Sequence, residues 1–260
     1  MSFSSQIQAV AYCRTPYKQK FGIPRQPGLV NAARGFIELQ APYRNIDTVR
    51  GLEQYSHLWL IFCFHKNLAQ GWKTTVRPPR LGGNEKMGVF ATRSTFRPNG
   101  LGQSVVKLHK IHQRKGYLAL EISGMDLLDG TPIIDIKPYI SFSDSVPDAL
   151  SGIAHKAPQL TQVEFSQDAK QQLATYERLK QYQHLEELII GVLGQDPRPA
   201  YKKAKADSKL YQVALYDLDI LWHVVKIAND KSDKIESHRN SEMDNENKII
   251  VQAIKMGISV

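Results

Sequence analysis

Short apolar or alternating runs, separated by clusters of glycine, proline and asparagine, make up the first 145 residues of the chain. Runs of this length between turn-forming residues are typical of β-strands. The predicted strands are residues 7–12, 35–39, 57–64, 88–92, 104–111, 117–122 and 133–136. No alternation of strands with helix-length segments is visible, so the pattern favours a barrel or a sandwich over a doubly wound parallel sheet.

The pattern changes after residue 165, where apolar residues recur at roughly helical spacing among glutamine, glutamate and lysine. This spacing predicts one or two helices within residues 166–193. Asp196-Pro197-Arg198-Pro199 must end them, because two prolines this close together cannot lie inside a helix. Residues 211–227 alternate and predict a hairpin that turns around residues 217–219.

These patterns predict a mainly β chain in two parts and a tail. A β-rich domain covers residues 1–150, and a small α/β domain covers residues 158–228. The tail, residues 229–260, is polar at first and ends in an apolar stretch. It fits either a linker with a docking helix or a disordered segment, and the pattern does not choose between them.

Composition places the chain among ordinary globular proteins. Hydrophobic residues make up 42% and charged residues 23%, which excludes an intrinsically disordered or collagen-like chain. The strongest apolar run, residues 57–64, is far shorter than the roughly 20 residues that cross a bilayer, and no signal peptide is recognisable. Two cysteines, Cys13 and Cys63, are too few for a disulfide framework. We expect a cytoplasmic protein with no membrane partner.

The net charge of +9 is concentrated in one part of the chain. Eight lysines and arginines, but only one acid, Glu85, lie between Trp72 and Lys110. Lysines and arginines that neutralise phosphates release counterions, so such a stretch is a candidate binding surface for nucleic acid. A solvated face with no partner is the other explanation of the same charge.

Several familiar sites are excluded. There is no Walker A loop, and Gly100-Leu101-Gly102 lacks the third glycine of a dinucleotide fingerprint. His109 and His112 are three residues apart beside a predicted strand and therefore point to opposite faces, so they do not share a metal. The sequence predicts no metal site.

Four loops at the ends of predicted strands carry dense polar or charged residues. They are residues 25–28, 65–66, 92–102 and 126–132. Loops held by a rigid β scaffold are common places for binding sites, although each of these could also be only a tight turn. Together the loops favour a ligand site without naming the ligand.

At the strings Arg93-Ser94-Thr95-Phe96-Arg97-Pro98-Asn99-Gly100-Leu101-Gly102, Asp126-Leu127-Leu128-Asp129-Gly130-Thr131-Pro132, Asp135-Ile136-Lys137-Pro138-Tyr139 and Asp196-Pro197-Arg198-Pro199-Ala200-Tyr201, the chain resembles the TsaA-like (TrmO-type) family. The resemblance runs from about residue 7 to residue 227. It implies a single β-barrel methyltransferase domain, outside the Rossmann class, and a small C-terminal domain. It also implies that S-adenosylmethionine binds near a homodimer interface. The implied reaction is methylation of N6 of N6-threonylcarbamoyladenosine at position 37 of threonine tRNA, in the anticodon loop.

The resemblance also implies which residues bind the cofactor. They are Gln26, Pro27, Gly28, His65, Lys66, Arg93, Leu101 or Gln103, Leu127, Leu128, Asp129 and Gly130. A sulfonium methyl is already activated, so the protein mainly aligns the reactants, but the poor nitrogen nucleophile benefits from a proton acceptor. The candidate acceptors are Asp126, Asp135 and His65. The candidate RNA contacts are Arg97, Lys107, Arg198, Tyr201, Lys202 and Lys203, with Tyr201 able to stack on a base.

Two other functions remain open on the sequence. The chain could be a non-catalytic β-barrel RNA-binding or adaptor protein, which would bind tRNA but no cofactor. It could also be a methyltransferase for another RNA site or a small molecule, which would bind the cofactor without regard to tRNA.

Overall fold

The structure, a computed structural model, describes residues 4–82, 84–199, 202–203, 205–227 and 247–257. The chain divides into two compact units, residues 1–157 and residues 158–260. Each unit is described by itself. Among the described residues, none of the helices is both long and apolar enough to span a membrane.

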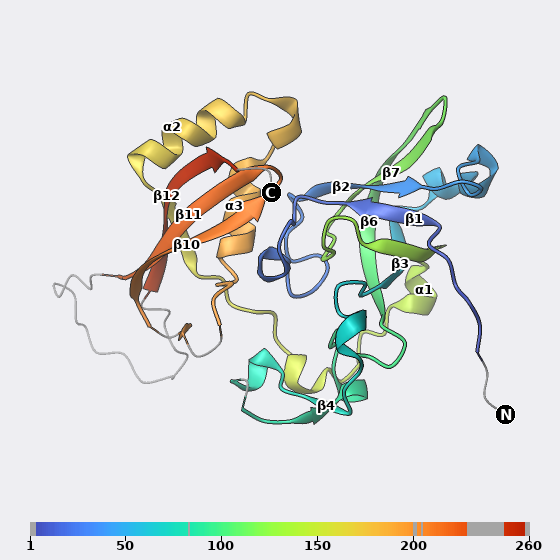
Figure 1. The fold of residues 1–260 in the computed structure, drawn as a ribbon, viewed down its shortest axis with the longest axis horizontal. Helices are drawn as coiled ribbons and strands as arrows, with labels where there is room; N and C mark the ends of the chain where they lie inside the picture. Colours follow the sequence, from blue (N-terminus) through green and yellow to red (C-terminus); the bar gives the residue numbers. More distant parts are fainter. Residues whose placement is uncertain (1–3, 83, 200–201, 204, 228–246, 258–260) are drawn as a thin grey trace. The chain divides into compact units, whose positions relative to one another are not determined.

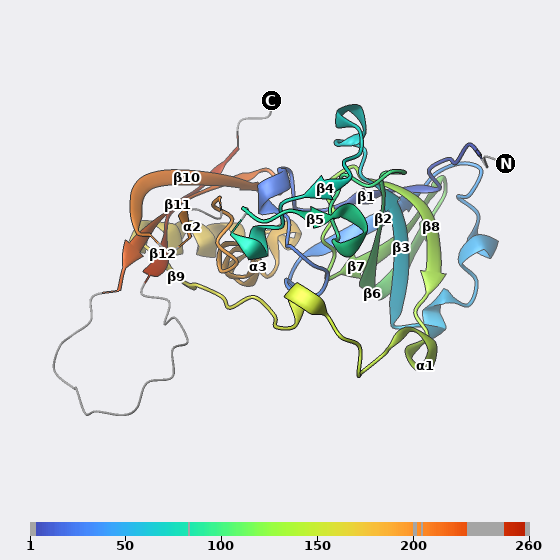
Figure 2. The same cartoon turned by 90° about the horizontal axis from the view of Figure 1, so that it is seen from below.

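The first unit is a closed antiparallel barrel with the strand order β1-β2-β7-β6-β3-β8 (Figure 1). Its strands are β1 (Ala11–Arg14), β2 (Arg34–Leu39), β3 (His57–Cys63), β6 (Leu101–Arg114), β7 (Tyr117–Ser123) and β8 (Pro132–Pro138). Figure 2 shows β3, β6, β7 and β8 side by side. A short strand pair, β4 (Thr75–Val76) and β5 (Met87–Gly88), lies in the connection from β3 to β6. A one-turn helix, α1 (Ser141–Asp144), follows β8.

Alternation of side chains fills the barrel interior. Along β3, Leu58, Leu60 and Phe62 are buried, while Trp59 and Ile61 between them are only half-buried. Successive side chains of a strand point to opposite faces, so the first three line the core. Burial of each such side chain stabilises the fold by about 1.5–3 kcal/mol relative to exposure. The long apolar run of β3 therefore serves both faces of a barrel wall.

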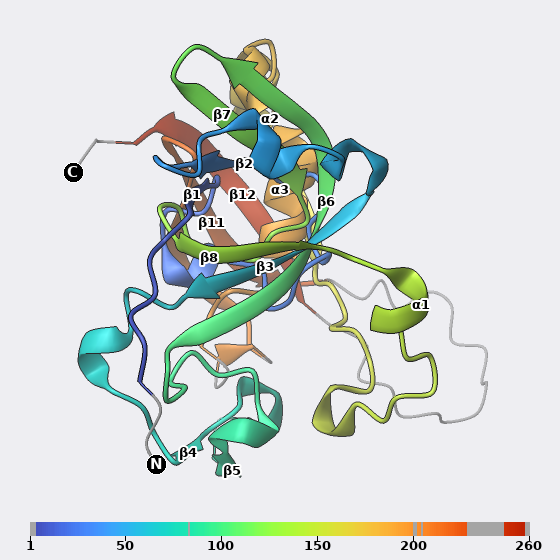
Figure 3. The ribbon, with the colours of Figure 1, turned by 90° about the vertical axis from the view of Figure 1, so that its right-hand side faces the viewer.

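The antiparallel order sorts the connections between strands to the two ends of the barrel. Residues 15–33, 64–100 and 124–131 connect β1 to β2, β3 to β6 and β7 to β8, and all three lie at one end. We call this end the loop rim. The short connection between β6 and β7 lies at the other end, and Figure 3 shows β4 and β5 at the opposite side of the barrel from that hairpin. Residues that are distant in sequence thus meet at the loop rim.

The predicted strand at residues 88–92 is wrong. Only Met87–Gly88 is extended, and Val89–Ala91 forms a single 3-10 turn in which Thr92 N donates to Val89 O. Val89 is buried, but Phe90 is 76% exposed, so the apolar residues of this segment do not share a strand face. The first strand also begins later than predicted, at Ala11, where pairing with both Leu39 and Ile133 starts.

The second unit is a four-stranded sheet in the order β10-β11-β12-β9 with two helices. Its elements are β9 (Gln162–Phe165), α2 (Gln167–Tyr176), α3 (Leu185–Leu193), β10 (Asp207–Leu215), β11 (Leu218–Lys226) and β12 (Asn247–Met256). Ser166 caps α2 because its Oγ accepts a hydrogen bond from Ala169 N. Ala169 and Leu173 on α2 are buried, and the helix packs on β12 and β9. The predicted fold class, mainly β with a barrel followed by a small α/β domain, is confirmed.

The tail differs from both predicted alternatives where the structure describes it. Residues 247–256 form β12, which pairs antiparallel with β11 and parallel with β9. Ile249 and Val251 are fully buried. Their alternation is a strand pattern, and a strand with neighbours on both sides belongs to the interior of its sheet. Residues 229–246 lie outside the described residues.

Candidate functional site

The predicted cofactor residues gather on the loop rim and at the adjoining start of β6. Gln26, Pro27 and Gly28 lie in the β1–β2 connection, and His65, Lys66 and Arg93 lie in the β3–β6 connection. Leu127, Leu128, Asp129 and Gly130 lie in the β7–β8 connection, and Leu101 and Gln103 are among the first three residues of strand β6. The barrel topology therefore brings four separate sequence blocks to one end of one domain.

Hydrogen bonds join the three connections to one another. Arg93 Nη1 donates to Gln26 Oε1 at 2.6 Å, which links the β3–β6 connection to the β1–β2 connection. Gly28 N donates to Gly124 O at 2.8 Å, which links the β1–β2 connection to the β7–β8 connection. The exposed Arg93 side chain is thus held at the rim with its guanidinium beside the amide of Gln26.

Two glycines leave the rim backbone open to a ligand. Gly28 and Gly130 have φ values of 79° and 76°, in the region that favours glycine. A Cβ atom at either position would meet no atom within 4 Å. The backbone at these two positions can therefore be approached closely by a bound molecule.

Asp126 is a half-buried acid of the rim. Its Oδ1 accepts a 2.5 Å hydrogen bond from Ser104 Oγ of β6. Burial raises the pKa of the Asp126 carboxyl to about 6, although the hydrogen bond from Ser104 and the charge of Arg93 act in the opposite direction. A carboxylate with this pKa is mostly ionised at neutral pH and can accept a proton near it.

Asp129 has a structural part in the rim. Its carboxylate accepts hydrogen bonds from Thr15 N at 2.9 Å and from Lys18 Nζ at 2.7 Å. Next to it, Gly130 N donates to Cys13 O. These bonds fix the β7–β8 connection against the end of β1, so that Asp129 holds the loop in place.

His65 and Lys66 follow β3 directly. Phe64 N donates to Gly100 O at 2.7 Å, and Leu101 pairs with Cys63, so the two predicted residues stand where β6 begins. Lys20 Nζ donates to Lys66 O at 3.1 Å. Partial burial, followed by the charges of Lys66 and Lys20, lowers the pKa of His65. At neutral pH His65 is therefore uncharged, and its ring can accept a proton or hydrogen bond.

Asp135 and Gln103 occupy a different surface from Asp126. Both pair with Ile61 of β3, one from β8 and the other from β6. Leu60 and Ser104, which precede Ile61 and follow Gln103 in their strands, are buried and point into the barrel. Successive side chains of a strand point to opposite faces, so Gln103 and Asp135, which both pair with Ile61, lie on the outer side of the barrel wall. Asp135 Oδ1 accepts a hydrogen bond from Ile136 N. Asp126 is the only one of the three predicted proton acceptors held by a buried side chain among the described residues.

The predicted RNA contacts in the barrel have different surroundings. Arg97 is half-buried, and its Nη1 donates to Val89 O and Thr92 O at 3.3 and 2.7 Å. Lys107 is exposed in the middle of β6, where it pairs with His57 and Ser123.

No group of three or more metal-ligating side chains is found in the described part of the chain.

Arg198 is buried, which argues against the predicted RNA contact. Only 1% of its side chain is exposed, and its guanidinium makes two 2.8 Å bonds to the Asp196 carboxylate and one to Lys205 O. Lys202 Nζ pairs with Asp207 at 2.9 Å, and Lys203 Nζ donates to Gln195 O. Arg198 therefore organises this loop from within. Tyr201 lies outside the described residues.

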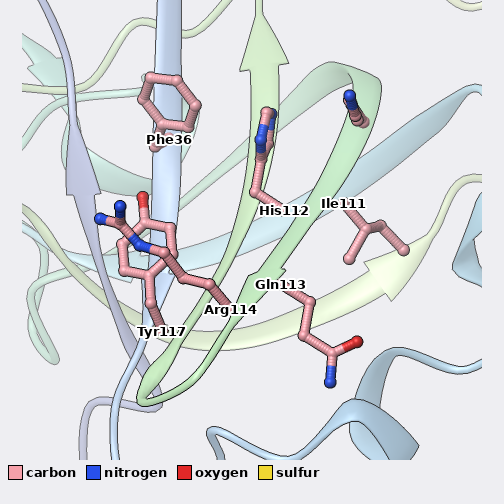
Figure 4. A pocket seen from close by; sticks show the side chains of 7 residues that line it. Phe36, Ile111, His112, Gln113, Arg114 and Tyr117 are labelled. Atoms are coloured by element: carbon pink, nitrogen blue, oxygen red, sulfur yellow. The ribbon is translucent and has the colours of Figure 1, made fainter.

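An open hollow at the β6–β7 hairpin contains none of the predicted site residues (Figure 4). Phe36 of β2 and His112, Arg114 and Tyr117 of the hairpin line it, and the Arg114 guanidinium lies 4.5 Å from the centroid of the Tyr117 ring. It belongs to the end of the barrel opposite the loop rim. The candidate site therefore rests on the geometry of the rim loops.

Sequence reasoning missed three residues that the rim uses. Ser104 binds Asp126, Lys18 binds Asp129, and Lys20 binds Lys66 O. Ser104 shares the buried face of β6 with Val106. A serine at an apolar position of an alternating strand was the signal available for it, whereas nothing in the sequence marks the two lysines.

The chain is similar to known proteins over most of its length. Residues 12–145 match the family model for the tRNA-methyltransferase O N-terminal domain, and residues 158–232 match that for the TrmO C-terminal domain. The chain is 50% identical to a tRNA (adenine(37)-N6)-methyltransferase of Escherichia coli, over 85% of this chain and 94% of the relative. It is 49% identical to a putative S-adenosylmethionine-dependent methyltransferase of Pseudomonas aeruginosa, over 84% and 91%. A crystal structure of TrmO from P. aeruginosa is similar to this structure, with a TM-score of 0.74 at 38% sequence identity, and the match covers 99% of both chains.

Proposed function

Since the chain belongs to the tRNA-methyltransferase O family, we propose that it transfers the methyl group of S-adenosylmethionine to N6 of N6-threonylcarbamoyladenosine at position 37 of threonine tRNA. The chain is an S-adenosylmethionine-dependent tRNA (adenine(37)-N6)-methyltransferase, like its named relatives. The threonylcarbamoyl group and the identity of the tRNA are the finer parts of the proposal. The observation that carries the proposal is the convergence of Gln26, Arg93 and the half-buried Asp126 on one rim.

The loop rim fits the cofactor's chemistry. S-adenosylmethionine carries a carboxylate, and the exposed Arg93, held by Gln26, offers a guanidinium that can bind it through two parallel hydrogen bonds. Gly28 and Gly130 leave open backbone next to these side chains. When bound, the cofactor supplies a methyl group already activated by its positively charged sulfur. The remaining predicted residues of the three connections would enclose it and exclude water.

Asp126 is the proton acceptor that the geometry favours. The attacking nitrogen of the acceptor loses its proton as the new bond to carbon forms, and its lone pair is delocalised into the carbamoyl group and the purine. Ser104 donates to Oδ1 of Asp126 and orients the carboxylate, whose lone pairs can accept that proton. With a pKa of about 6, the carboxylate is ionised at pH 7 and yet basic enough to serve. His65, neutral at this pH, is the second candidate, and Asp135 on the outer wall is the third.

The substrate RNA would approach over the basic surface beside the rim. Lys66 and Arg97 lie in the β3–β6 connection, and Lys107 is exposed on β6. Lys202 and Lys203 belong to the second unit, where their partly exposed side chains are further proposed RNA contacts that are independent of this surface. Phosphate contacts of this kind bind and position RNA without reading its sequence.

We further infer that the enzyme acts as a homodimer in the cytoplasm. The resemblance of its motifs to the family supports a cofactor site near a dimer interface, and tRNA is the substrate of its relatives. Light scattering at micromolar concentration should give twice the 29.4 kDa of the chain. A measured mass equal to one chain in the presence of the cofactor would contradict the dimer. It would leave the proposed reaction unaffected.

Methyl transfer from labelled S-adenosylmethionine tests the proposed function. Threonine tRNA transcripts with and without the threonylcarbamoyl group at adenosine 37 serve as matched acceptors. Label in the modified tRNA alone is the expected result. Equal label in both would contradict the dependence on the threonylcarbamoyl group. Label in neither, with no cofactor binding by calorimetry, would favour an RNA-binding protein without chemistry.

A further inference from the structure

The β3–β6 connection contains a lobe, which we define as residues 66–97 and of which the structure describes all but residue 83. Two backbone hydrogen bonds tie its segments together: Val89 N donates to Thr74 O at 3.0 Å, and Lys73 N donates to Phe96 O at 3.2 Å. The short strands β4 and β5 pair between them. Val89, which is buried, anchors the middle of the lobe. The lobe therefore has a defined backbone structure and adjoins the candidate site.

Two large aromatic side chains of the lobe are exposed. Phe90 is 76% exposed, although its neighbour Val89 is only 3% exposed, and Trp72 is 55% exposed. The 3-10 turn Val89–Ala91 sets the backbone at Phe90, so the ring is presented by an ordered segment. A single exposed apolar residue needs no explanation, but two aromatic rings within one lobe and beside a catalytic rim suggest a role in binding.

Cations accompany the aromatic rings of the lobe. The Arg97 guanidinium carbon lies 5.8 Å from the centroid of the Phe90 ring, and two carbonyl oxygens hold that guanidinium in place. Lys73 Nζ lies 4.3 Å from the centroid of the Phe96 ring. Such cations contribute attraction to a ring and also carry charge to its side. A ring flanked by positive charge suits a ligand that has both a flat face and a negative backbone.

The charge of the whole lobe points to the same ligand. It contains seven lysines and arginines and a single acid, Glu85. The basic residues are Lys66, Lys73, Arg77, Arg80, Lys86, Arg93 and Arg97. Exposed aromatic rings that alternate with lysine and arginine bind single-stranded nucleic acid, because bases stack on the rings while the cations follow the phosphates.

We propose that Phe90 and Trp72 form a stacking platform for unpaired bases of the substrate RNA that flank the methylated adenosine. This inference rests on the proposed function, which places an anticodon loop at the adjoining rim. It gives these two residues a part in substrate binding that is separate from cofactor binding. The basic side chains of the lobe other than Arg93 then hold the phosphates on either side.

Substitution of the rings by leucine tests the platform, since leucine stays apolar but cannot stack. F90L and W72L should each weaken binding of threonine tRNA about tenfold and raise its KM to a similar extent. Cofactor affinity and the salt dependence of tRNA binding should stay as in the unsubstituted protein. F90Y and W72F keep a ring and should keep the affinity. F142L is the matched control, because Phe142 is 91% exposed on α1 and lies outside the lobe.

Fluorescence gives a second readout that a purely structural role would not move. Stacking of a base on Trp72 should quench its emission when a short single-stranded RNA of the anticodon-loop sequence is added. The quenching should be lost in W72F, because Trp222 is buried in the second unit and Trp59 lies on β3, outside the lobe, with its indole N–H bound to Asp144. Persistence of the full quenching in W72F would contradict stacking on Trp72.

The outcomes separate this inference from the proposed function. If the unsubstituted protein methylates tRNA and F90L and W72L bind it equally well, the platform is overturned and the enzyme stands. If F90L instead converts a dimer to a monomer without loss of tRNA affinity, the face is an interface between two copies, and the platform is again overturned. If the unsubstituted protein transfers no methyl group to any tRNA, the proposed function fails.

Discussion

Ser104 Oγ donates a 2.5 Å hydrogen bond to Asp126 Oδ1, so a buried serine of the barrel wall holds a half-buried acid of the loop rim. The bond fixes the orientation of the carboxylate. Burial raises the pKa of Asp126 to about 6, which is the range in which a carboxylate works as a base near neutral pH. Reaction and stability should therefore both depend on this carboxyl.

Replacement of Asp126 by asparagine removes the proton acceptor and keeps the shape. We expect D126N to lower kcat by about 10²–10⁴-fold and to leave cofactor affinity within about twofold, because loss of a general base acts on the chemical step. Single-turnover methyl transfer and calorimetry measure the two quantities. D148N, at an exposed acid after α1, is the matched control. Normal turnover by D126N would show that Asp126 is not the proton acceptor and would leave His65 and Asp135 as the candidates.

The pH dependence of kcat/KM should follow the same carboxyl. Activity should fall as the pH drops through about 6, because protonated Asp126 cannot accept a proton. Burial lowers the pKa of His65, so its own protonation lies below the ordinary histidine value. A profile that is flat between pH 5 and 7, on protein shown to stay folded, would contradict the assignment to Asp126.

Asp126 should also lower the stability of the fold at neutral pH. Its folded pKa of about 6 lies above the ordinary 3.8, so the folded state favours the protonated form. This cost is absent below the unfolded value, grows as the pH rises from 3.8 to about 6, and stays at about 3 kcal/mol at higher pH. D126N should therefore gain stability over the unsubstituted protein at pH 8 and lose that gain at pH 4. Denaturant unfolding at the two pH values checks this, and an equal difference at both would contradict it.

Arg93 offers a test of the cofactor site. R93A should weaken S-adenosylmethionine binding about tenfold or more and leave the unfolding temperature almost unchanged, because an exposed arginine adds little to the core. R93K keeps the charge but loses the two-pronged geometry, so its loss should be intermediate. Calorimetry and thermal unfolding on both variants measure the effect. Unchanged affinity in R93A would remove Arg93 from the cofactor site.

The barrel was predictable because its strands carry their own pattern. The run at residues 57–64 became β3, and the alternation at residues 104–111 became the longer β6. The segment 88–92 misled because Val89 and Phe90 are both apolar, although only Val89 is buried. Exposure of Phe90 depends on the turn at Val89–Ala91, which local composition does not encode.

The tail and the loop after α3 were not predictable for a different reason. Strand β12 carries the alternation of a strand, but the partners that stabilise it, β11 on one side and β9 on the other, are distant in sequence and are not marked in the tail itself. Arg198 looked like a surface cation because it stands among prolines and lysines. Its burial follows from Asp196, two residues away, whose carboxylate neutralises it inside the loop.

The buried pair of Arg198 and Asp196 should matter for stability. R198M leaves the Asp196 carboxylate buried without its partner, which costs about 3–5 kcal/mol. The second unit should therefore unfold at a markedly lower temperature. The double variant R198M/D196N removes both charges and should recover part of the loss. An unchanged unfolding temperature in R198M would contradict the structural role and return Arg198 to the candidate RNA contacts.

The central claim is that this chain methylates N6 of the threonylcarbamoyl-modified adenosine at position 37. Mass spectrometry of nucleosides and mapped fragments from threonine tRNA, after incubation with the protein and S-adenosylmethionine, tests it most directly. The account predicts a gain of one methyl group on the threonylcarbamoyladenosine of the anticodon-loop fragment, and no such gain with D126N. A methyl group on any other nucleoside, or none with cofactor bound, would contradict it.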